Sequence, residues 1–301
     1  MKPAQIKLLR KLALARAIRF RSSRLPRHGC LISSDGIRLH YLDWPGGRDT
    51  LLLLHGGNLS AHTFDLLALA LPDTVRCIAV DLRGHGLSGW AEQYSIARCT
   101  ADVVELAEGL SLTEIHVAGM SLGGCIAGHT ALALDRRLKS LTFIDVADQV
   151  NFEATLRTRE FFERLQQPIH RVHDLVKLAI NASPRTDPDL MLYRYQNMLK
   201  PGPDGFTWRA DRRLAEDFQN VIKKLSEIAN FAPKISCPVL AVKGGRSQIL
   251  DQEKLERFTS RFPQGISIVV PNAGHNVQED QPVALAAALQ GVIAKAKYAR
   301  R

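Results

Sequence analysis

The chain contains 301 residues, of which 46% are hydrophobic, and it carries a formal net charge of +10. This length suits one large domain, with or without an insertion, and no apolar run is long enough to span a membrane. Nine of the 40 lysines and arginines precede the first acidic residue, Asp35, which leaves 31 basic residues against 30 acidic ones. The body is therefore nearly neutral, which argues against a nucleic-acid-binding body.

Residues 1–24 combine basic and apolar side chains and contain no acid. Apolar residues recur at helical spacing from Ile6 onward, without the long apolar centre of a secretory signal. Three interpretations are open: a helix that packs on the body or on a second subunit, a helix on an anionic membrane surface, and an organelle-targeting presequence. Unless this arm directs it elsewhere, we expect a cytoplasmic protein with reduced cysteines.

The next segments predict the first strands and the first helix of an α/β sheet. Residues 31–44 predict a hairpin that turns at Ser-Asp-Gly. The continuous apolar runs at 50–54 and 76–80 are typical of strands buried on both faces. Residues 101–109 have the apolar spacing of a helix that covers one face of the sheet, and 114–118 predict the following strand.

A tight turn follows at residues 119–123, Gly-Met-Ser-Leu-Gly, before an alanine-rich run that predicts a helix. Ser121 at the tip of such a turn has a strained backbone, and neighbours that carry a Cβ would clash with it. The turn exposes the Ser121 hydroxyl, and the helix N-terminus offers free N–H groups and the positive end of a dipole. For the pentapeptide taken alone, the alternative is a serine N-cap in a glycine-rich helix entry.

Residues 140–146 predict a further strand, after which the alternation of strands and helices stops. From 148 to 232 the composition is helical, and five prolines interrupt it. The alternation resumes with strands predicted at 238–242 and 266–270, and a helix after Gln281 closes the chain.

Four motifs in this order resemble those of the α/β-hydrolase superfamily. They are His55-Gly56-Gly57-Asn58, Asp-Leu-Arg-Gly-His-Gly-Leu-Ser at 81–88, the Ser121 pentapeptide and Gly274-His275. The resemblance covers residues 31–297 and implies an α/β-hydrolase fold, with a mostly parallel central sheet, helices on both faces and a helical cap inserted after the sixth strand. The implied parts are a basic amphipathic N-terminal extension (1–30), the first part of the hydrolase core (31–147), the cap (148–232) and the second part of the core (233–301).

A serine hydroxyl is a weak nucleophile that needs a base, and the base needs an acidic partner. The resemblance implies that Ser121 is the nucleophile and His275 the base. It also implies that the backbone N–H groups of Gly57 and Leu122 form an oxyanion hole, where two fixed donors meet the negative charge on a carbonyl oxygen.

The acid is the member that departs from the pattern of the family. Most relatives carry it after the penultimate strand, where this sequence has Ser247 and Gln248. We favour Asp145, at the end of the preceding strand, as the acid. Asp148 and Asp251 are alternatives, and so is a serine–histidine dyad that has no acid.

Candidate substrate-binding residues include Asn58, beside the oxyanion loop, and apolar residues of the predicted cap. The cap residues are Phe152, Phe161, Phe162, Met191, Tyr195 and Trp208. Ordinary helix packing is the alternative for each of them. An apolar wall predicts a small-molecule substrate of small to medium size that is largely apolar. We expect neither a cofactor nor a metal site.

The expected function is that of a serine hydrolase, which cleaves an ester, thioester, lactone or related acyl bond through an acyl-enzyme on Ser121. A serine at this position argues against epoxide hydrolases and dehalogenases, because those relatives use an aspartate nucleophile. Two alternatives keep the fold. One is a carbon–carbon bond hydrolase or a cofactor-free oxygenase or lyase, and the other is a non-enzymatic receptor that binds a small ligand beneath the cap.

Overall fold

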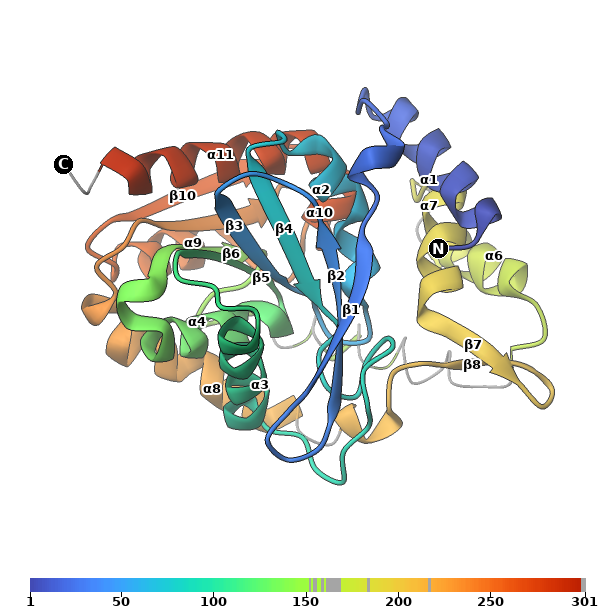
Figure 1. Ribbon diagram of the computed structural model, residues 1–301, viewed down its shortest axis with the longest axis horizontal. Coiled ribbons are helices and arrows are strands. Elements are labelled where there is room, and N and C mark those ends of the chain that lie inside the picture. The colour runs from blue at the N-terminus through green and yellow to red at the C-terminus, as the bar shows by residue number, and fades with distance from the viewer. Residues whose placement is uncertain are drawn as a thin grey trace.

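The computed structural model has a central sheet between two layers of helices (Figure 1). The structure describes residues 1–301 except 152, 154–155, 158–159, 161–168, 183–184, 216–217 and 299–301. In this part of the chain eight strands form the main sheet. They are β1 (Arg27–Ile32), β2 (Arg38–Trp44), β3 (Asp49–Leu54), β4 (Val75–Val80), β5 (Ile115–Met120), β6 (Leu138–Ile144), β9 (Val239–Gly244) and β10 (Gly265–Val270).

The order of the strands across the sheet is β1-β2-β4-β3-β5-β6-β9-β10. β2 pairs antiparallel with β1 and with β4, whereas every pair from β4 across to β10 is parallel. This arrangement confirms the predicted α/β-hydrolase fold. The opening hairpin predicted at 31–44 begins earlier, at Arg27, so the first strand starts inside the segment that we separated as an extension.

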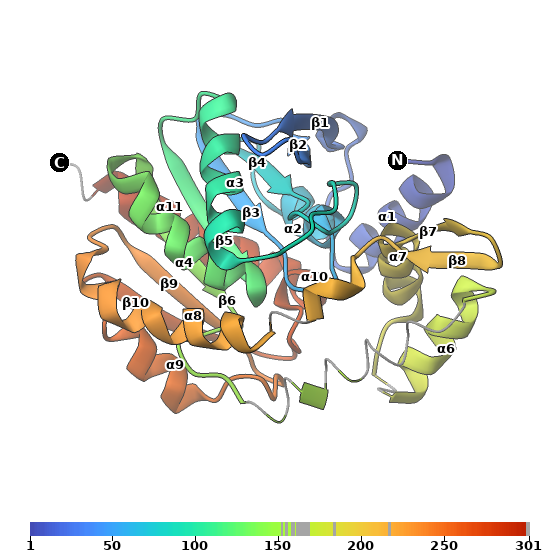
Figure 2. The ribbon, with the colours of Figure 1, turned by 90° about the horizontal axis from the view of Figure 1, so that it is seen from below.

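Different helices cover the two faces of the sheet (Figure 1, Figure 2). On one face lie α2 (Asp65–Ala70), α10 (Val277–Asp280) and α11 (Pro282–Tyr298). On the other lie α3 (Ile96–Gly109), α4 (Leu122–Leu134), α8 (Phe218–Phe231) and α9 (Gln252–Thr259). Short 3-10 turns are η1 (Ser22–Arg24), η2 (Ala61–Phe64), η3 (Asp135–Arg137), η4 (Arg212–Ala215) and η5 (Ala232–Lys234).

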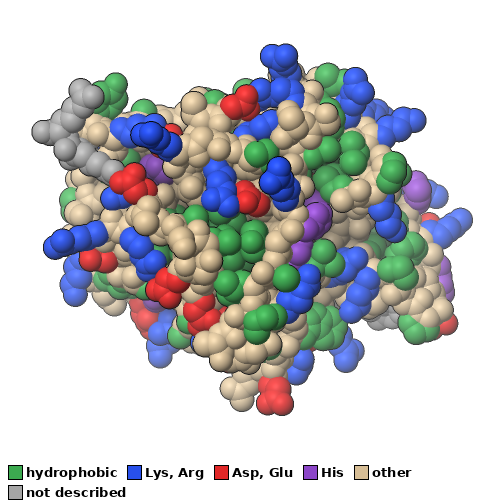
Figure 3. Space-filling view, viewed as in Figure 1, with side chains coloured by type: hydrophobic (Ala, Val, Ile, Leu, Met, Phe, Trp, Pro, Cys, Tyr) green, Lys and Arg blue, Asp and Glu red, His purple; other side chains and the backbone are tan. Residues whose placement is uncertain are grey.

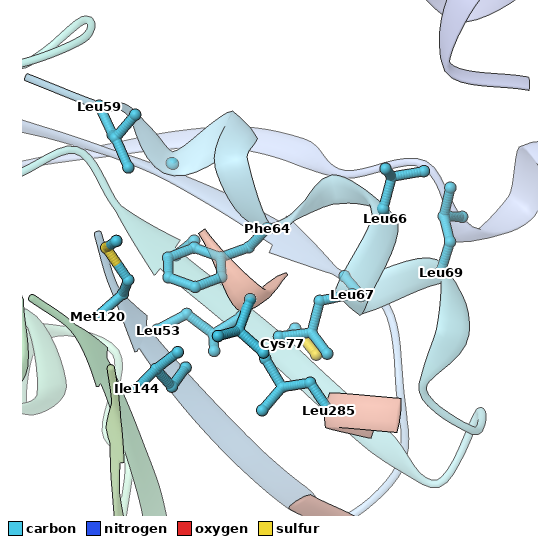
Figure 4. Packing of buried hydrophobic residues seen from close by; sticks show 14 of the residues in the cluster. Leu53, Leu59, Phe64, Leu66, Leu67, Leu69, Cys77, Met120, Ile144 and Leu285 are labelled. Atoms are coloured by element: carbon cyan, nitrogen blue, oxygen red, sulfur yellow. The ribbon is translucent and has the colours of Figure 1, made fainter. Parts of the chain in front are cut away.

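The side chains of β3 alternate between two clusters of buried residues. Leu51 and Leu53 pack on the side of α2 and α11, Leu52 and Leu54 on the side of α3 and α4, and each is at most 1% exposed. Figure 4 shows part of the first cluster, with Leu53, Phe64, Leu67, Cys77 and Leu285. Burial of apolar surface stabilises the folded state by ~25 cal/mol per Å². Since successive side chains of a strand point to opposite faces, the four leucines of β3 favour helices that cover both faces of the sheet.

The segment between β6 and β9 departs from the alternation of strands and helices, as predicted. It contains α6 (Val172–Ala182), α7 (Pro188–Met198), the antiparallel pair β7 (Leu199–Gly202) and β8 (Gly205–Trp208), and α8. We did not predict this hairpin, because its strands are only four residues long and carry Pro201, Gly202 and Gly205. Residues 152–165, at the start of the stretch of helical composition, lie largely outside the described residues.

The N-terminal arm forms the helix α1 (Pro3–Ala15), which lies beside α7 and α2 (Figure 1). Its buried residues are Leu9, Leu12 and Ala13, which join the same cluster as α2. The arm therefore packs on the body, the first of the three interpretations, while membrane contact and targeting stay predictions. Lys and Arg side chains gather on the surface around α1 (Figure 3). Of the described helices, none is long and apolar enough to cross a membrane.

Two leucines of α1 give a matched test of this packing. Leu9→Ala is expected to lower the free energy of unfolding by about 2–5 kcal/mol, because it opens a cavity between α1 and the body. Leu14→Ala should change it by less than about 0.5 kcal/mol, because Leu14 is 61% exposed. Urea denaturation followed by tryptophan fluorescence measures both values. Two variants of equal stability would show that α1 does not pack on the body in solution.

Candidate active site

Ser121 occupies the tight turn between β5 and α4. Its backbone has φ 52° and ψ −116°, a conformation that residues with a side chain rarely adopt. Two neighbouring glycines make room for it, because an added Cβ at Gly119 or Gly123 would lie 2.1 Å from a backbone carbonyl oxygen. Ser121 N–H donates to the carbonyl of Ile144 at 3.1 Å, which ties the turn to the end of β6. The predicted sequence of strand, turn and helix is therefore confirmed.

His275 lies in the loop after β10, within hydrogen-bond distance of a buried carboxylate. Its Nδ1 is 2.7 Å from Oδ2 of Asp145, which follows β6 and is 0% exposed. A second donor to Oδ2 is the hydroxyl of Ser247, and the backbone N–H of Gly244 donates to Oδ1 at 2.8 Å. An ionised carboxylate only accepts, so this contact places a proton on His275 Nδ1, and in the neutral imidazole Nε2 then has the free lone pair.

The other candidate acids have different partners. Asp148 is buried and faces Arg261, whose Nε is 3.5 Å away. Asp251 caps α9 through a 2.8 Å hydrogen bond from the N–H of Lys254. The loop in which most relatives carry the acid does reach the site, but it supplies the Ser247 hydroxyl to Asp145 instead of a carboxylate.

A cavity of about 230 Å³ joins these elements. Ser121 and His275 line it, together with the predicted oxyanion residues Gly57 and Leu122 and the predicted substrate residue Asn58. Most of the other described lining residues are apolar, among them Leu59, Leu82, Ile96, Met120, Val146, Val150, Leu214, Val221, Ile222, Leu225 and Ile249. The cavity thus places the hydroxyl of Ser121 and the imidazole of His275 in a wall that is mainly apolar.

The predicted cap residues are placed differently. Met191, Tyr195 and Trp208 do not line the cavity. Met191 and Tyr195 belong to the buried cluster that also contains residues of α1 and α2, and Trp208 packs against it. The ring centroids of Tyr195 and Trp208 are 6.1 Å apart. Phe152, Phe161 and Phe162 lie outside the described residues. α7 instead contributes Arg194 to the cavity wall, which we did not predict. Its signal in the sequence is a charge between two tyrosines of α7, Tyr193 and Tyr195.

The loop after β4 is held by another buried carboxylate, Asp81. It accepts hydrogen bonds from His40 Nδ1 at 2.7 Å, from the N–H of Ala61 at 2.7 Å and from the N–H of Leu87 at 2.8 Å. Burial by itself would raise the pKa of Asp81, but His40, the nearby His55 and the N–H of Ala61 outweigh it and lower the pKa to about 2. Asp81 therefore fixes residues 81–88 beneath the cavity.

Two further histidines support the loops around the cavity. His55 Nδ1 donates to the carbonyl of Gly56 at 2.8 Å, and its Nε2 accepts from the N–H of Leu82 at 3.0 Å. His85 lines the cavity, but burial and the neighbouring His55 lower its pKa to about 3. Its Nδ1 donates to the carbonyl of Arg83. Both side chains thus serve to hold the backbone.

Known proteins resemble this chain over most of its length. The model of the alpha/beta hydrolase family matches residues 51–288. The chain is 30% identical to an esterase of Mycobacterium tuberculosis over 84% of this chain and 85% of that protein. It is 27% identical to the 3-hydroxybutyrate-oligomer hydrolase of Cupriavidus necator, over 88% and 97% of the two chains.

The structure is similar to that of E-2-(acetamidomethylene)succinate hydrolase, with a TM-score of 0.80 at 23% identity over 89% of this chain and 99% of the other. A solved Mycobacterium tuberculosis esterase gives 0.76 at 24% identity, over 96% and 98% of the two chains. At these identities the likeness shows the fold.

The hydrogen bonds to Asp81 predict a specific pH dependence of stability. Because its pKa is about 2 in the folded protein and near 3.8 when exposed, the ionised form stabilises the fold above pH 4, and this stability is lost as the pH falls toward 2. Between pH 5 and pH 3, the wild type should lose about 1 kcal/mol more unfolding free energy than Asp81→Asn. Urea titrations at the two pH values measure this difference. Asp204→Asn, in the exposed β7–β8 turn, should behave as the wild type. An equal loss in Asp81→Asn would contradict the prediction.

Proposed function

The chain belongs to the alpha/beta hydrolase family, and we propose that it is a serine hydrolase that cleaves an ester, thioester, lactone or related acyl bond through an acyl-enzyme on Ser121. The observation that carries the proposal is the buried Asp145 carboxylate 2.7 Å from His275, in a cavity that His275 shares with Ser121. Similarity to an esterase and to an oligomer hydrolase supports hydrolysis of an ester.

In this mechanism Ser121 Oγ attacks the carbonyl carbon of the substrate, and His275 Nε2 accepts the proton of the hydroxyl. Asp145 accepts a hydrogen bond from Nδ1–H of His275 and stabilises the imidazolium that forms. His275 then returns the proton to the leaving oxygen or sulfur. A water molecule attacks the acyl-enzyme by the same route, which releases the acid and restores Ser121.

Two backbone donors are proposed to bind the oxyanion. Leu122 is the first residue of α4, so its N–H has no partner within the helix and lies at the positive end of the helix dipole. Gly57, after β3, is its neighbour, because a Cβ built on Gly57 would lie 4.0 Å from Leu122 Cδ2. Removal of one such donor typically costs about 10²–10³ in kcat.

The segment between β6 and β9 is proposed to act as the cap. Its α8 supplies Val221, Ile222 and Leu225 to the cavity, and its α7 supplies Arg194. A wall of this kind keeps water away from the acyl-enzyme and shapes the acyl pocket. The volume of about 230 Å³ suits an acyl group of small to medium size.

Substitution of two aspartates tests the proposal and the identity of the acid. Hydrolysis of 4-nitrophenyl acetate, butyrate and octanoate is followed by the absorbance of the released 4-nitrophenolate. Asp145→Asn should lower kcat by about 10²-fold or more, because His275 loses the partner that fixes its tautomer. Asp251→Asn, in an exposed helix cap, is the matched control and should keep the wild-type kcat. A folded wild type that leaves all three esters intact would overturn the proposal, and a loss confined to Asp251→Asn would overturn the choice of acid.

A further inference from the structure

The cavity of Ser121 and His275 contains a cation that the proposed chemistry does not use. Arg194 projects from α7 into the cavity wall, and its side chain is 17% exposed. The surrounding wall is mainly apolar. Burying a charged group in an apolar wall costs free energy unless the group is paired. The partners of Arg194 therefore decide whether its guanidinium is available to a ligand.

A second arginine in the wall, Arg83, has its hydrogen bonds filled. Its guanidinium donates twice to Asp102, at 2.6 Å each, and twice to Asp35, at 3.1 and 3.2 Å. Its side chain is only 1% exposed. Among the described residues that line the cavity there is no lysine, aspartate or glutamate. Of the two arginines that line the described part of the cavity, Arg194 is therefore the one whose side chain can contact a ligand.

Arg194 pairs with one carboxylate and keeps hydrogen-bond donors that this carboxylate does not use. Its Nη2 donates to Glu279, whose side chain is 5% exposed and whose other oxygen accepts from the Thr63 hydroxyl at 2.8 Å. Nε of Arg194 is buried and has no partner among the described residues. A guanidinium carries five N–H groups, so one carboxylate leaves its hydrogen bonding incomplete.

The same contact keeps Arg194 charged and fixed. Burial disfavours the charged guanidinium, but the Glu279 carboxylate outweighs this and raises the pKa of Arg194. Glu279 belongs to α10, which begins two residues after His275. The guanidinium of Arg194 is thus anchored to the same segment that follows the proposed base, His275.

We infer that Arg194 makes the site selective for esters that carry a carboxylate at a distance from the scissile bond. The inference rests on the proposed function and names its substrate class: short aliphatic esters with one acidic end group. An incoming carboxylate would complete the hydrogen bonds of the guanidinium, and such a charge-assisted contact is strong in an apolar site. A neutral ester of the same length would leave these donors unpaired.

Two pairs of esters of matched length test the inference, and acid release is followed in a pH-stat. The first pair is monomethyl adipate and methyl hexanoate, with the carboxylate on the acyl side. The second is 4-(butanoyloxy)butanoate and butyl butanoate, with the carboxylate on the alcohol side. In at least one pair, the wild type should show the higher kcat/KM for the acidic ester. Arg194→Gln should lower the ratio of acidic to neutral kcat/KM at least tenfold.

Further variants guard against a merely structural effect. The double variant Arg194→Gln/Glu279→Gln leaves no unpaired buried carboxylate and should show the same loss of ratio. Glu279→Gln alone removes the competing acid and should raise the ratio. Arg171→Gln changes an exposed arginine of the same insertion and should leave both kcat/KM values unchanged. An unchanged ratio in Arg194→Gln and in the double variant, for both pairs, overturns the inference.

Binding of the product separates this inference from the proposed function. If a folded wild type hydrolyses none of the esters, the proposed function fails. Isothermal titration calorimetry with adipate and hexanoate then tests Arg194 by itself. Adipate binding that is at least tenfold weaker in Arg194→Gln/Glu279→Gln supports the inference, and equal binding to both proteins overturns it.

Discussion

The buried carboxylate of Asp145 is the group on which the arrangement of this site depends. A carboxylate that is removed from water must find donors inside the protein, or it costs several kcal/mol. Asp145 finds them in the N–H of Gly244, the hydroxyl of Ser247 and Nδ1 of His275. Gly244 ends β9, Ser247 follows it and His275 follows β10, while Asp145 follows β6. The hydrogen bonds that allow the carboxylate to be buried are thus the same ones that orient the imidazole toward the cavity of Ser121.

A second buried carboxylate, Glu279, connects the proposed cap and the N-terminal arm to this arrangement. Its side chain accepts from Thr63 and Arg194, and its backbone carbonyl accepts from Nε of Arg16 at 3.3 Å. Arg16 also bonds to Asp187, the N-cap of α7, at 3.1 Å. The basic arm and α7 therefore meet the core just after the loop of His275, which places the insertion at the cavity and explains why its helix α7 supplies a lining residue.

The backbone of the site could be predicted from local constraints, whereas the directions of its side chains could not. The glycines around Ser121 and the leucine run of β3 leave few alternatives, because sterics and burial on both faces act within a few residues. The choice of Asp145 over two other aspartates stayed open in the sequence, because it depends on a contact with a residue 130 positions away. Met191 and Tyr195 were placed in the pocket by their type, but helical spacing does not tell which face of α7 meets the core. For the same reason Arg194 was missed.

Intact-mass analysis after incubation with a fluorophosphonate tests the central claim most directly, since only a serine activated by a base reacts readily with this probe. The account predicts one adduct on the wild type and none on Ser121→Ala. A folded wild type without an adduct would contradict an activated Ser121, and an equal adduct on both proteins would show that the reactive group lies elsewhere.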